Sequence, residues 1–377
     1  MSSTTAVKET QFTKQFAEFK TSLGGDASVA DREAAFAFFE AAGFPTVRDE
    51  DWKYTNVAPL VSEEWKVVSG GSSSPNDGVA AFNFRRNGFT ALNIAFADVA
   101  VVRIPRDTSV IEPIELNFAA EDGSAIFPHV IVIAEAGSKA TIVETYASSG
   151  RGFTNAAINI LVEENANLTH YRVQKDSGES LNYGVTEVEV RGGAHYDSTN
   201  INLGAAVSRH DIEVRFTSEG GEAWVDGLYM LNGSQHHDTH SMIDHTVPNC
   251  TSHQTYKGVI NDNSRGVFNG KVFVRENAHG TDAQQSNKNL LLSDSARVDT
   301  KPQLEIFNDD VKCSHGATVG QLEDEELFYL LARGLPTDLA KNLLTYGFAE
   351  EVINKIGIDE IKSELDAMVM NRLGTEI

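Results

Sequence analysis

The chain has 377 residues, of which 41% are hydrophobic and 23% are charged, and its formal net charge is −23 from 31 basic and 54 acidic side chains. This composition is typical of a folded protein with two or three domains, or one elongated domain, and it excludes a disordered chain. The acidic balance argues against a nucleic-acid binder and against binding to an anionic membrane, because both need basic side chains.

The number of cysteines and the N-terminal sequence further limit the class of protein to which the chain can belong. The two cysteines, Cys250 and Cys313, are too few for a disulfide framework or for a self-contained metal site of four thiolates. The first residues, MSSTTAVKETQFTKQF, contain no apolar h-region, and no run of about 18 apolar residues occurs anywhere. We therefore expect a cytoplasmic protein with reduced cysteines.

Residues 1–68 form the predicted N-terminal helical region. Three aromatic rings fall at i, i+4 and i+7 and so share one helix face: Phe12, Phe16 and Phe19. A second helix is predicted to begin with Asp31 as its N-cap and to stop at Gly43. The Gly- and Ser-rich segment 69–77 then predicts a loop or linker.

Residues 78–318 form the predicted β core, with β patterning from about Ala91 to Val311. Short alternating runs rich in Val, Ile, Thr and Tyr recur there, separated by Gly or Asn turns. Four similar turns, spaced by 28, 26 and 29 residues, have as equivalent positions Ala140, Leu168, Ala194 and Ala223. A repeat of this length indicates a stacked coil of paired strands, with a β-sandwich as the alternative.

Residues 319–377 form the predicted C-terminal helical domain. The first helix runs from Glu323 to Arg333, the second from a Thr337 cap to Gly347, and the third starts at an Asp359 cap. Their apolar faces either dock a partner or cap the open end of the β-stack.

Common catalytic motifs are missing from the sequence. The segment GVFNGKV, 266–272, resembles a phosphate-binding loop, but it has three residues between its glycines and a valine after its lysine. We interpret it as a turn between strands, and we find no nucleophile elbow, zincin motif or dinucleotide fingerprint. We expect a protein that does not hydrolyse nucleotides itself.

Two clusters could nevertheless carry chemistry. In HHDTHSMIDH, side chains of a strand would alternate, so His236, Asp238 and His240 share one face. Two imidazoles and a carboxylate could bind iron or zinc. The alternative is a polar strand that faces solvent or another subunit.

The second cluster is DDVKCSHG, in which an extended chain turns Cys313 and His315 the same way and Lys312 the other. A thiolate beside an imidazole suits zinc, ferrous iron or an iron–sulfur intermediate, and a nearby positive charge would favour the thiolate. Two ligands cannot close a four-coordinate site. The missing ligands come either from elsewhere in the fold or from another subunit, or else both residues simply pack.

A resemblance bears on these alternatives. Residues 289–348, NLLLSDSARVDTKPQLEIFNDDVKCSHGATVGQLEDEELFYLLARGLPTDLAKNLLTYGF, resemble the SufB/SufD family of iron–sulfur cluster assembly scaffolds. FPTVRDEDWKYTNVAPL (44–60) and, more weakly, ALNIAF (91–96) are also similar to that family. The sequence QQSNKNLLL has no cysteine before its leucines and CSHG surrounds Cys313, and both features resemble the SufD branch.

The resemblance implies a right-handed parallel β-helix between N-terminal and C-terminal helical regions. It implies a scaffold subunit of a SufBCD complex rather than an enzyme, with ATP hydrolysis left to the partner SufC. His315 and Cys313 would help hold a nascent cluster at a β-helix interface with SufB. SufC would dock on the C-terminal helices, so we single out four of their apolar residues as contacts or their support: Leu327, Phe328, Leu331 and Leu343.

The same resemblance implies no permanently held cofactor, only a transient iron or iron–sulfur cluster shared with SufB, and it leaves open whether a flavin binds the assembled complex. A homodimer in isolation is compatible with it. Two other hypotheses stand beside the scaffold: a homodimeric structural β-helix without a metal role, and a β-helix lyase acting on acidic polysaccharide. The net charge of −23 and the lack of a signal peptide disfavour the lyase.

Overall fold

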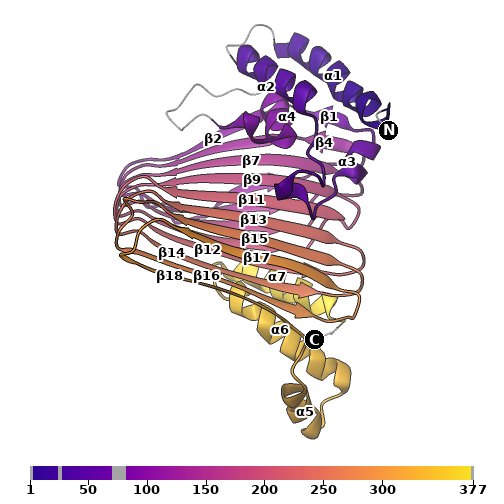
Figure 1. Cartoon of the computed structure of the whole chain (residues 1–377). Coiled ribbons are helices and arrows are strands. Elements are labelled where there is room, and N and C mark those ends of the chain that lie inside the picture. Colours follow the sequence, from indigo (N-terminus) through magenta and orange to yellow (C-terminus); the bar gives the residue numbers. More distant parts are fainter. Residues whose placement is uncertain (1–2, 24–27, 70–81, 375–377) are drawn as a thin grey trace.

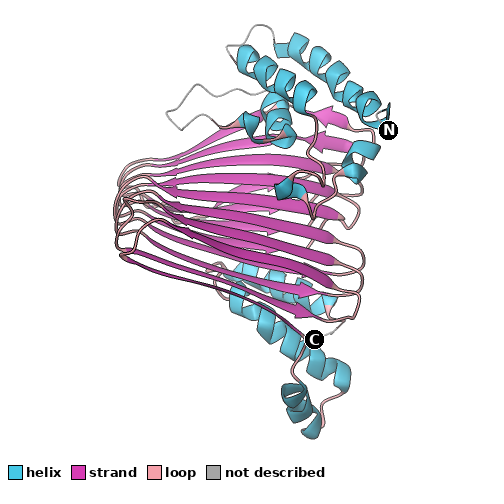
Figure 2. Cartoon of the chain, viewed as in Figure 1, coloured by secondary structure: helices cyan, strands magenta, loops and turns pink. Residues whose placement is uncertain are grey.

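The computed structural model describes residues 3–23, 28–69 and 82–374, and the predicted linker therefore lies almost entirely outside the described residues. Strands fill the middle of the chain and helices flank them at both ends (Figure 2). The strands of sheet A are β1 (Lys66–Val68), β2 (Asp98–Ile104), β4 (Ser124–Ile126), β5 (Pro128–Ala134), β7 (Phe153–Val162), β9 (Leu181–Val190), β11 (Val207–Phe216), β13 (His236–His245), β15 (Arg265–Val274) and β17 (Arg297–Ile306). The strands of sheet B are β3 (Ile114–Phe118), β6 (Lys139–Tyr146), β8 (Asn167–Gln174), β10 (His195–Asn202), β12 (Glu222–Leu231), β14 (Thr251–Ile260), β16 (Thr281–Leu291) and β18 (Val311–Gly320).

From β6 onward, successive strands alternate between the two sheets, and each strand pairs in parallel with the strand two further along the chain. The chain thus coils through sheet A and sheet B in turn, which confirms the predicted parallel β-helix (Figure 1). The β-sandwich alternative is wrong, because sandwiches are built from antiparallel sheets.

Left-handed residues at the turns set the repeat. Each strand of sheet B from β6 to β16 is preceded by a residue with φ between +58° and +74°, and these residues are Gly137, Asn165, Gly193, Gly220, Asn249 and Gly280. Gly and Asn adopt this conformation at the lowest cost. The third residue after each is a ladder position, so Ala140, Leu168 and Ala223 are equivalent as predicted. The fourth position is Tyr196, two residues beyond the predicted Ala194.

The inward side chains of the two sheets make a largely apolar core between them. It includes Val130, Ile158, Val188 and Ile212 and extends to Cys313 at the last strand. Burial of such β-branched side chains stabilises the stack by about 25 cal/mol per Å² of apolar surface. The core therefore explains the alternation seen in the sequence.

The N-terminal helices pack on sheet A through aromatic side chains. They are α1 (Ser3–Leu23), α2 (Val29–Ala42), α3 (Ala58–Ser62) and α4 (Gly88–Phe96), with short 3₁₀ turns at Glu50–Trp52 and Phe84–Arg86. Phe12 and Phe16 are buried as predicted, and Phe16 stacks on Phe36 with ring centroids 4.2 Å apart. This cluster continues into Phe153 and Tyr183 of sheet A.

Two boundary predictions in this region are wrong. Helix α2 has Ser28 rather than Asp31 at its N-cap, so Asp31 lies in the first turn, where its charge complements the helix dipole. Residues 88–96 form helix α4 rather than the start of the β region, because Asn87 caps it with a reciprocal hydrogen bond to Thr90. The predicted stop at Gly43 is confirmed by its φ of +65°.

The C-terminal helices are α5 (Asp324–Ala332), α6 (Thr337–Ile353) and α7 (Asp359–Arg372), and the later part of α6 and α7 lie against the outer face of sheet B (Figure 1). The buried contact joins Val352, Ile353 and Val369 to outward side chains of β6 to β14 such as Leu228 and Val259. The helices do not cap the open end of the β-stack. Helix α6 continues through Gly347 to Ile353, which corrects its predicted end, because packing on sheet B compensates the cost of a helical glycine.

Candidate functional site

The β-helix ends in two strands that each have a neighbour on one side only. In the described residues, β17 pairs with β15 and β18 pairs with β16, and neither has a partner beyond. Unpaired N–H and C=O groups of such an edge are available to another chain. We call this end of the stack, strands β17 and β18, the open end.

Cys313 and His315 both lie on β18 at the open end. They pair with Ala283 and Gln285 of β16, which are buried inside the stack, so both positions are on the inward face of their strand. Cys313 is half-buried, whereas His315 is exposed because no later turn covers it. The structure therefore brings the two residues together as the sequence predicted.

The environment of Cys313 differs from the prediction that a positive neighbour favours its thiolate. Lys312 is exposed and points to the opposite face of β18. Burial raises the pKa of the Cys313 thiol, and the charge of Asp282 acts in the same direction. In the chain alone the thiol form is favoured, and a metal or another cation would have to displace its proton.

The strand β13 that carries His236, Asp238 and His240 is covered by the N-terminal segment of the same chain. The Thr55 hydroxyl donates to Asp238 Oδ2 at 2.5 Å and lies 2.9 Å from His236 Nε2. His240 Nε2 lies 3.1 Å from Asp238 Oδ1. The three residues share one outer face, as predicted, but any contact between His236 or Asp238 and another subunit would require this segment to move.

Arg209 on β11 joins this cluster to the segment above it. Its guanidinium bonds Asp211 at 2.7 Å and Asp238 at 3.1 Å, donates to the backbone oxygen of Asp51, and lies 3.9 Å from the ring centroid of Trp52. Burial opposes the ionisation of Asp238, but His240 and Arg209 outweigh it and hold the pKa of this carboxyl far below its usual range. The charges are compensated within the cluster, which favours a structural role over a metal site.

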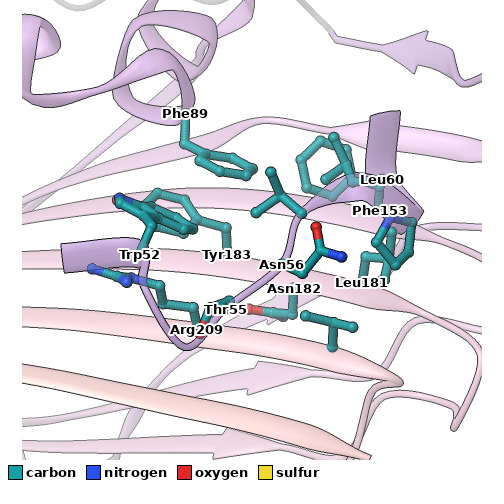
Figure 3. A pocket seen from close by; sticks show the side chains of 13 residues that line it. Trp52, Thr55, Asn56, Leu60, Phe89, Phe153, Leu181, Asn182, Tyr183 and Arg209 are labelled. Carbon is teal, nitrogen blue, oxygen red and sulfur yellow. The ribbon is translucent and has the colours of Figure 1, made fainter. Parts of the chain in front are cut away.

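Figure 3 shows a small pocket between this segment and sheet A, with Trp52, Phe89 and Tyr183 on one side and Leu60, Phe153 and Leu181 on the other. Its cavity volume of about 20 Å³ is close to that of one water-sized probe. The pocket is a packing defect under the covering segment and is too small for a substrate.

A wider groove of about 420 Å³ follows the outer face of sheet A beside His240. Its charged lining is mixed, with the acidic side chains Glu50, Asp51, Asp211 and Glu213 and the basic side chains Arg86, Arg209, Lys271 and Lys301. Arg86 binds Glu213 directly, and Lys301 lies 3.8 Å from Glu50. The groove therefore has no charge bias that would select an acidic polysaccharide.

The four apolar residues singled out in the C-terminal helices are at the surface or close to it. Leu327 and Leu331 are half-buried, whereas Phe328 is 71% and Leu343 is 40% exposed. Tyr329, at 55% exposed, adds to the same region. Only the later part of α6 is fixed to sheet B, so α5 and the start of α6 project from the body of the molecule (Figure 1).

Sequence reasoning missed Thr55 and Arg209, whose partners lie 183 and 29 residues away along the chain. Only the Trp in the segment EDWKYTN hinted that this segment is buried. Over the residues that the structure describes, we find no cluster of three or more His, Cys, Asp or Glu side chains arranged to hold a metal. In the same residues, no helix has the length and hydropathy needed to cross a membrane.

Comparisons with known proteins agree with the fold. Residues 117–348 match the family described as SUF system FeS cluster assembly, SufBD core domain, and residues 6–83 match the SufBD protein N-terminal region. The chain is 38% identical to an iron–sulfur cluster assembly SufBD family protein of Synechocystis over 75% of this chain and 66% of that protein. It is 30% identical to the iron–sulfur cluster assembly protein SufD of Escherichia coli, over 88% of this chain and 90% of that protein.

SufD of Bacillus subtilis is also 30% identical, over 75% of this chain and 66% of that protein. The match to the core family covers more than half of the chain, and it includes β18 with Cys313 and His315. The chain therefore belongs to the SufBD family of iron–sulfur cluster assembly proteins and resembles its SufD members.

Proposed function

We propose that this chain is a non-catalytic scaffold subunit for iron–sulfur cluster assembly, which pairs with a SufB-type partner through the open end. The single observation that carries the proposal is the position of Cys313 and His315 on the uncovered edge strand β18. A thiol and an imidazole there can bind a nascent cluster, and a partner that extends the sheets would supply the remaining ligands. The cluster is cargo that leaves, so this chain holds no resident cofactor.

The surface around these two residues supports pairing. Ile306 and Phe307, at and just after the end of β17, are 40% and 55% exposed, and Val319 on β18 is 49% exposed. Apolar side chains beside an unpaired strand edge are suited to burial against another chain. A second copy of this chain could occupy the same edge, which keeps the homodimeric structural protein as the competing hypothesis.

We further propose that a SufC-type ATPase docks on α5 and the start of α6. Phe328, Tyr329 and Leu343 are large apolar side chains exposed on these helices, and the first turn of α5 is acidic. Nucleotide hydrolysis would then be the partner's task, since GVFNGKV lies within strand β15 rather than in a loop before a helix. The prediction of a turn between strands at this segment is wrong.

Co-purification with SufB- and SufC-type partners, followed by iron and sulfide analysis, tests the proposal. We expect a complex of all three chains in which His315→Ala lowers the cluster content but leaves assembly intact. Intact assembly with unchanged cluster content would favour the purely structural role. Phe328→Asp should abolish association with the ATPase alone, and failure of wild type to associate with either partner would refute the proposal.

A further inference from the structure

Two facing rows of inward side chains in the β-helix end in polar groups near the open end. In sheet B, one row of inward side chains crosses β12, β14, β16 and β18 and consists of Val225, Gln254, Gln285 and His315. In sheet A, the facing row crosses β11, β13, β15 and β17 and consists of Ile212, Ser241, Gly270 and Pro302. In the last turns of these two rows, hydrogen-bonding groups replace the apolar pair Val225 and Ile212. Earlier turns of the same rows also contain buried polar side chains, which are His170, Ser198 and Thr186.

These polar groups bind one another but leave one donor, Gln254 Nε2, and one acceptor, Gln285 Oε1, without a partner among the described residues. Gln285 Nε2 donates to Gln254 Oε1 at 2.7 Å, and the Ser241 hydroxyl donates to the same oxygen at 3.1 Å. Gln285 is 3% exposed, and its Oε1 has no hydrogen-bond partner among the described residues. Burying an acceptor without a partner is unfavourable, and an apolar residue like Val225 would avoid that cost. The Gln285 Oε1 atom is therefore available to a donor at the open end.

Gly270 on the facing sheet makes the space that the Gln285 amide occupies. A Cβ at this position would collide with Gln285 Nε2 and would lie 2.7 Å from the Phe268 ring. The next residue of that row, Pro302, has neither an N–H nor a polar side chain. The next polar side chain after Gln285 toward the open end in these two rows is therefore His315.

His315 is the cross-strand neighbour of Gln285, and adjacent strands lie about 4.8 Å apart. Both side chains are on the inward face, and the imidazole is exposed whereas the amide is buried. An imidazole N–H complements an amide oxygen. A histidine that binds a metal through one ring nitrogen is usually oriented by a hydrogen bond from its other ring nitrogen.

We propose that Gln285 is a positioning residue for His315, its Oε1 accepting the imidazole N–H and thereby fixing the ring and its tautomer. The second ring nitrogen is then unprotonated and faces the open end, where it binds iron. The inference about iron rests on the proposed function, whereas the contact between the two side chains does not.

The contact is tested in the full chain alone. Histidine rings are labelled with ¹⁵N, the His315 signals are assigned from their loss in His315→Ala, and their tautomer is measured at about pH 8. We expect one dominant tautomer in wild type and in Gln285→Glu, whose carboxyl keeps an acceptor oxygen. Gln285→Leu should give exchange-averaged shifts. Gln284→Leu, on the exposed face of the same strand, is the matched control and should resemble wild type.

Gly270→Ala should also remove the hydrogen bond between Gln285 and His315, since it displaces the amide without changing Gln285. It also keeps the test available if Gln285→Leu does not fold, as judged by circular dichroism. Identical His315 shifts in wild type and in a folded Gln285→Leu or Gly270→Ala variant would overturn the proposal.

The effect of Gln285 on iron retention is measured in the complex with SufB- and SufC-type partners, after the complex has been loaded with ferrous iron and sulfide. We expect Gln285→Leu to weaken iron retention about tenfold or more and Gln284→Leu to leave it within about twofold. If His315→Ala lowers retention and Gln285→Leu does not, the positioning role is wrong. If neither variant lowers it while the tautomer still depends on Gln285, the contact stands and the proposed function fails.

Discussion

Replacing Arg209 with methionine tests how the N-terminal segment is held on sheet A. The substitution keeps an unbranched apolar stem but removes the guanidinium that pairs with two buried carboxylates, since Asp211 is 5% and Asp238 is 1% exposed. Breaking a buried ion pair in this way costs about 3–5 kcal/mol. Loss of the guanidinium over the Trp52 ring adds up to about 2 kcal/mol.

The assay combines urea unfolding with amide hydrogen exchange over residues 44–60. We expect Arg209→Met to lower the free energy of unfolding by about 4–6 kcal/mol and to speed exchange in that segment more than in β5 or β6. Arg215→Met is the matched control, because its side chain is 60% exposed and lies 3.6 Å from Asp244, so it should cost less than about 1 kcal/mol.

A variant that also removes the two carboxylate charges separates the loss of attraction to Arg209 from the cost of leaving buried carboxylates unpaired. With Asp211→Asn and Asp238→Asn added to Arg209→Met, most of the lost stability should return, because neutral amides are far cheaper to bury than unpaired carboxylates. An Arg209→Met chain that loses less than about 1 kcal/mol, with unchanged exchange over residues 44–60, would refute the reasoning.

Three further predictions follow from the same structure. Burial lowers the pKa of His129 and of His245 to about 4, below the value of 6.5 in the unfolded chain. The stability that each neutral imidazole contributes is therefore present above pH 6.5 and is lost as the pH falls toward 4. The free energy of unfolding should fall by about 3 kcal/mol for each histidine. Urea midpoints measured at several pH values should show this slope weakened in His129→Gln but not in the exposed His279→Gln, and an unchanged slope in both would contradict it. Lys355→Met leaves the buried Asp226 without its cation and should loosen α7 from sheet B, detected as faster hydrogen exchange there. The control Lys362→Met, at a half-buried lysine of α7, should not have this effect. Gly233→Ala should cost about 1 kcal/mol for its left-handed backbone alone, and Gly137→Ala should cost more because its Cβ also meets the Asp107 side chain; equal losses in thermal unfolding would argue against that contact.

Local sequence patterns determined much of the fold. The Gly and Asn turns carry left-handed φ values that few other residues tolerate, so their spacing alone predicted a coil of paired strands. The period-2 alternation predicted which side chains face inward and which face outward. It correctly placed Cys313 and His315 on the same face of their strand. Helices with apolar stripes were equally visible at both ends of the chain.

Tertiary structure decided what covers each face. The sequence could not show that Thr55 lies over His236 and Asp238, or that α6 and α7 pack along sheet B instead of capping the stack, because these contacts join residues far apart in the chain. The same holds for Gln285: its burial beside Gly270 and its missing partner exist only once two sheets face each other. Short-range patterns depend on backbone geometry within a few residues, whereas a site at the open end depends on which strand comes last.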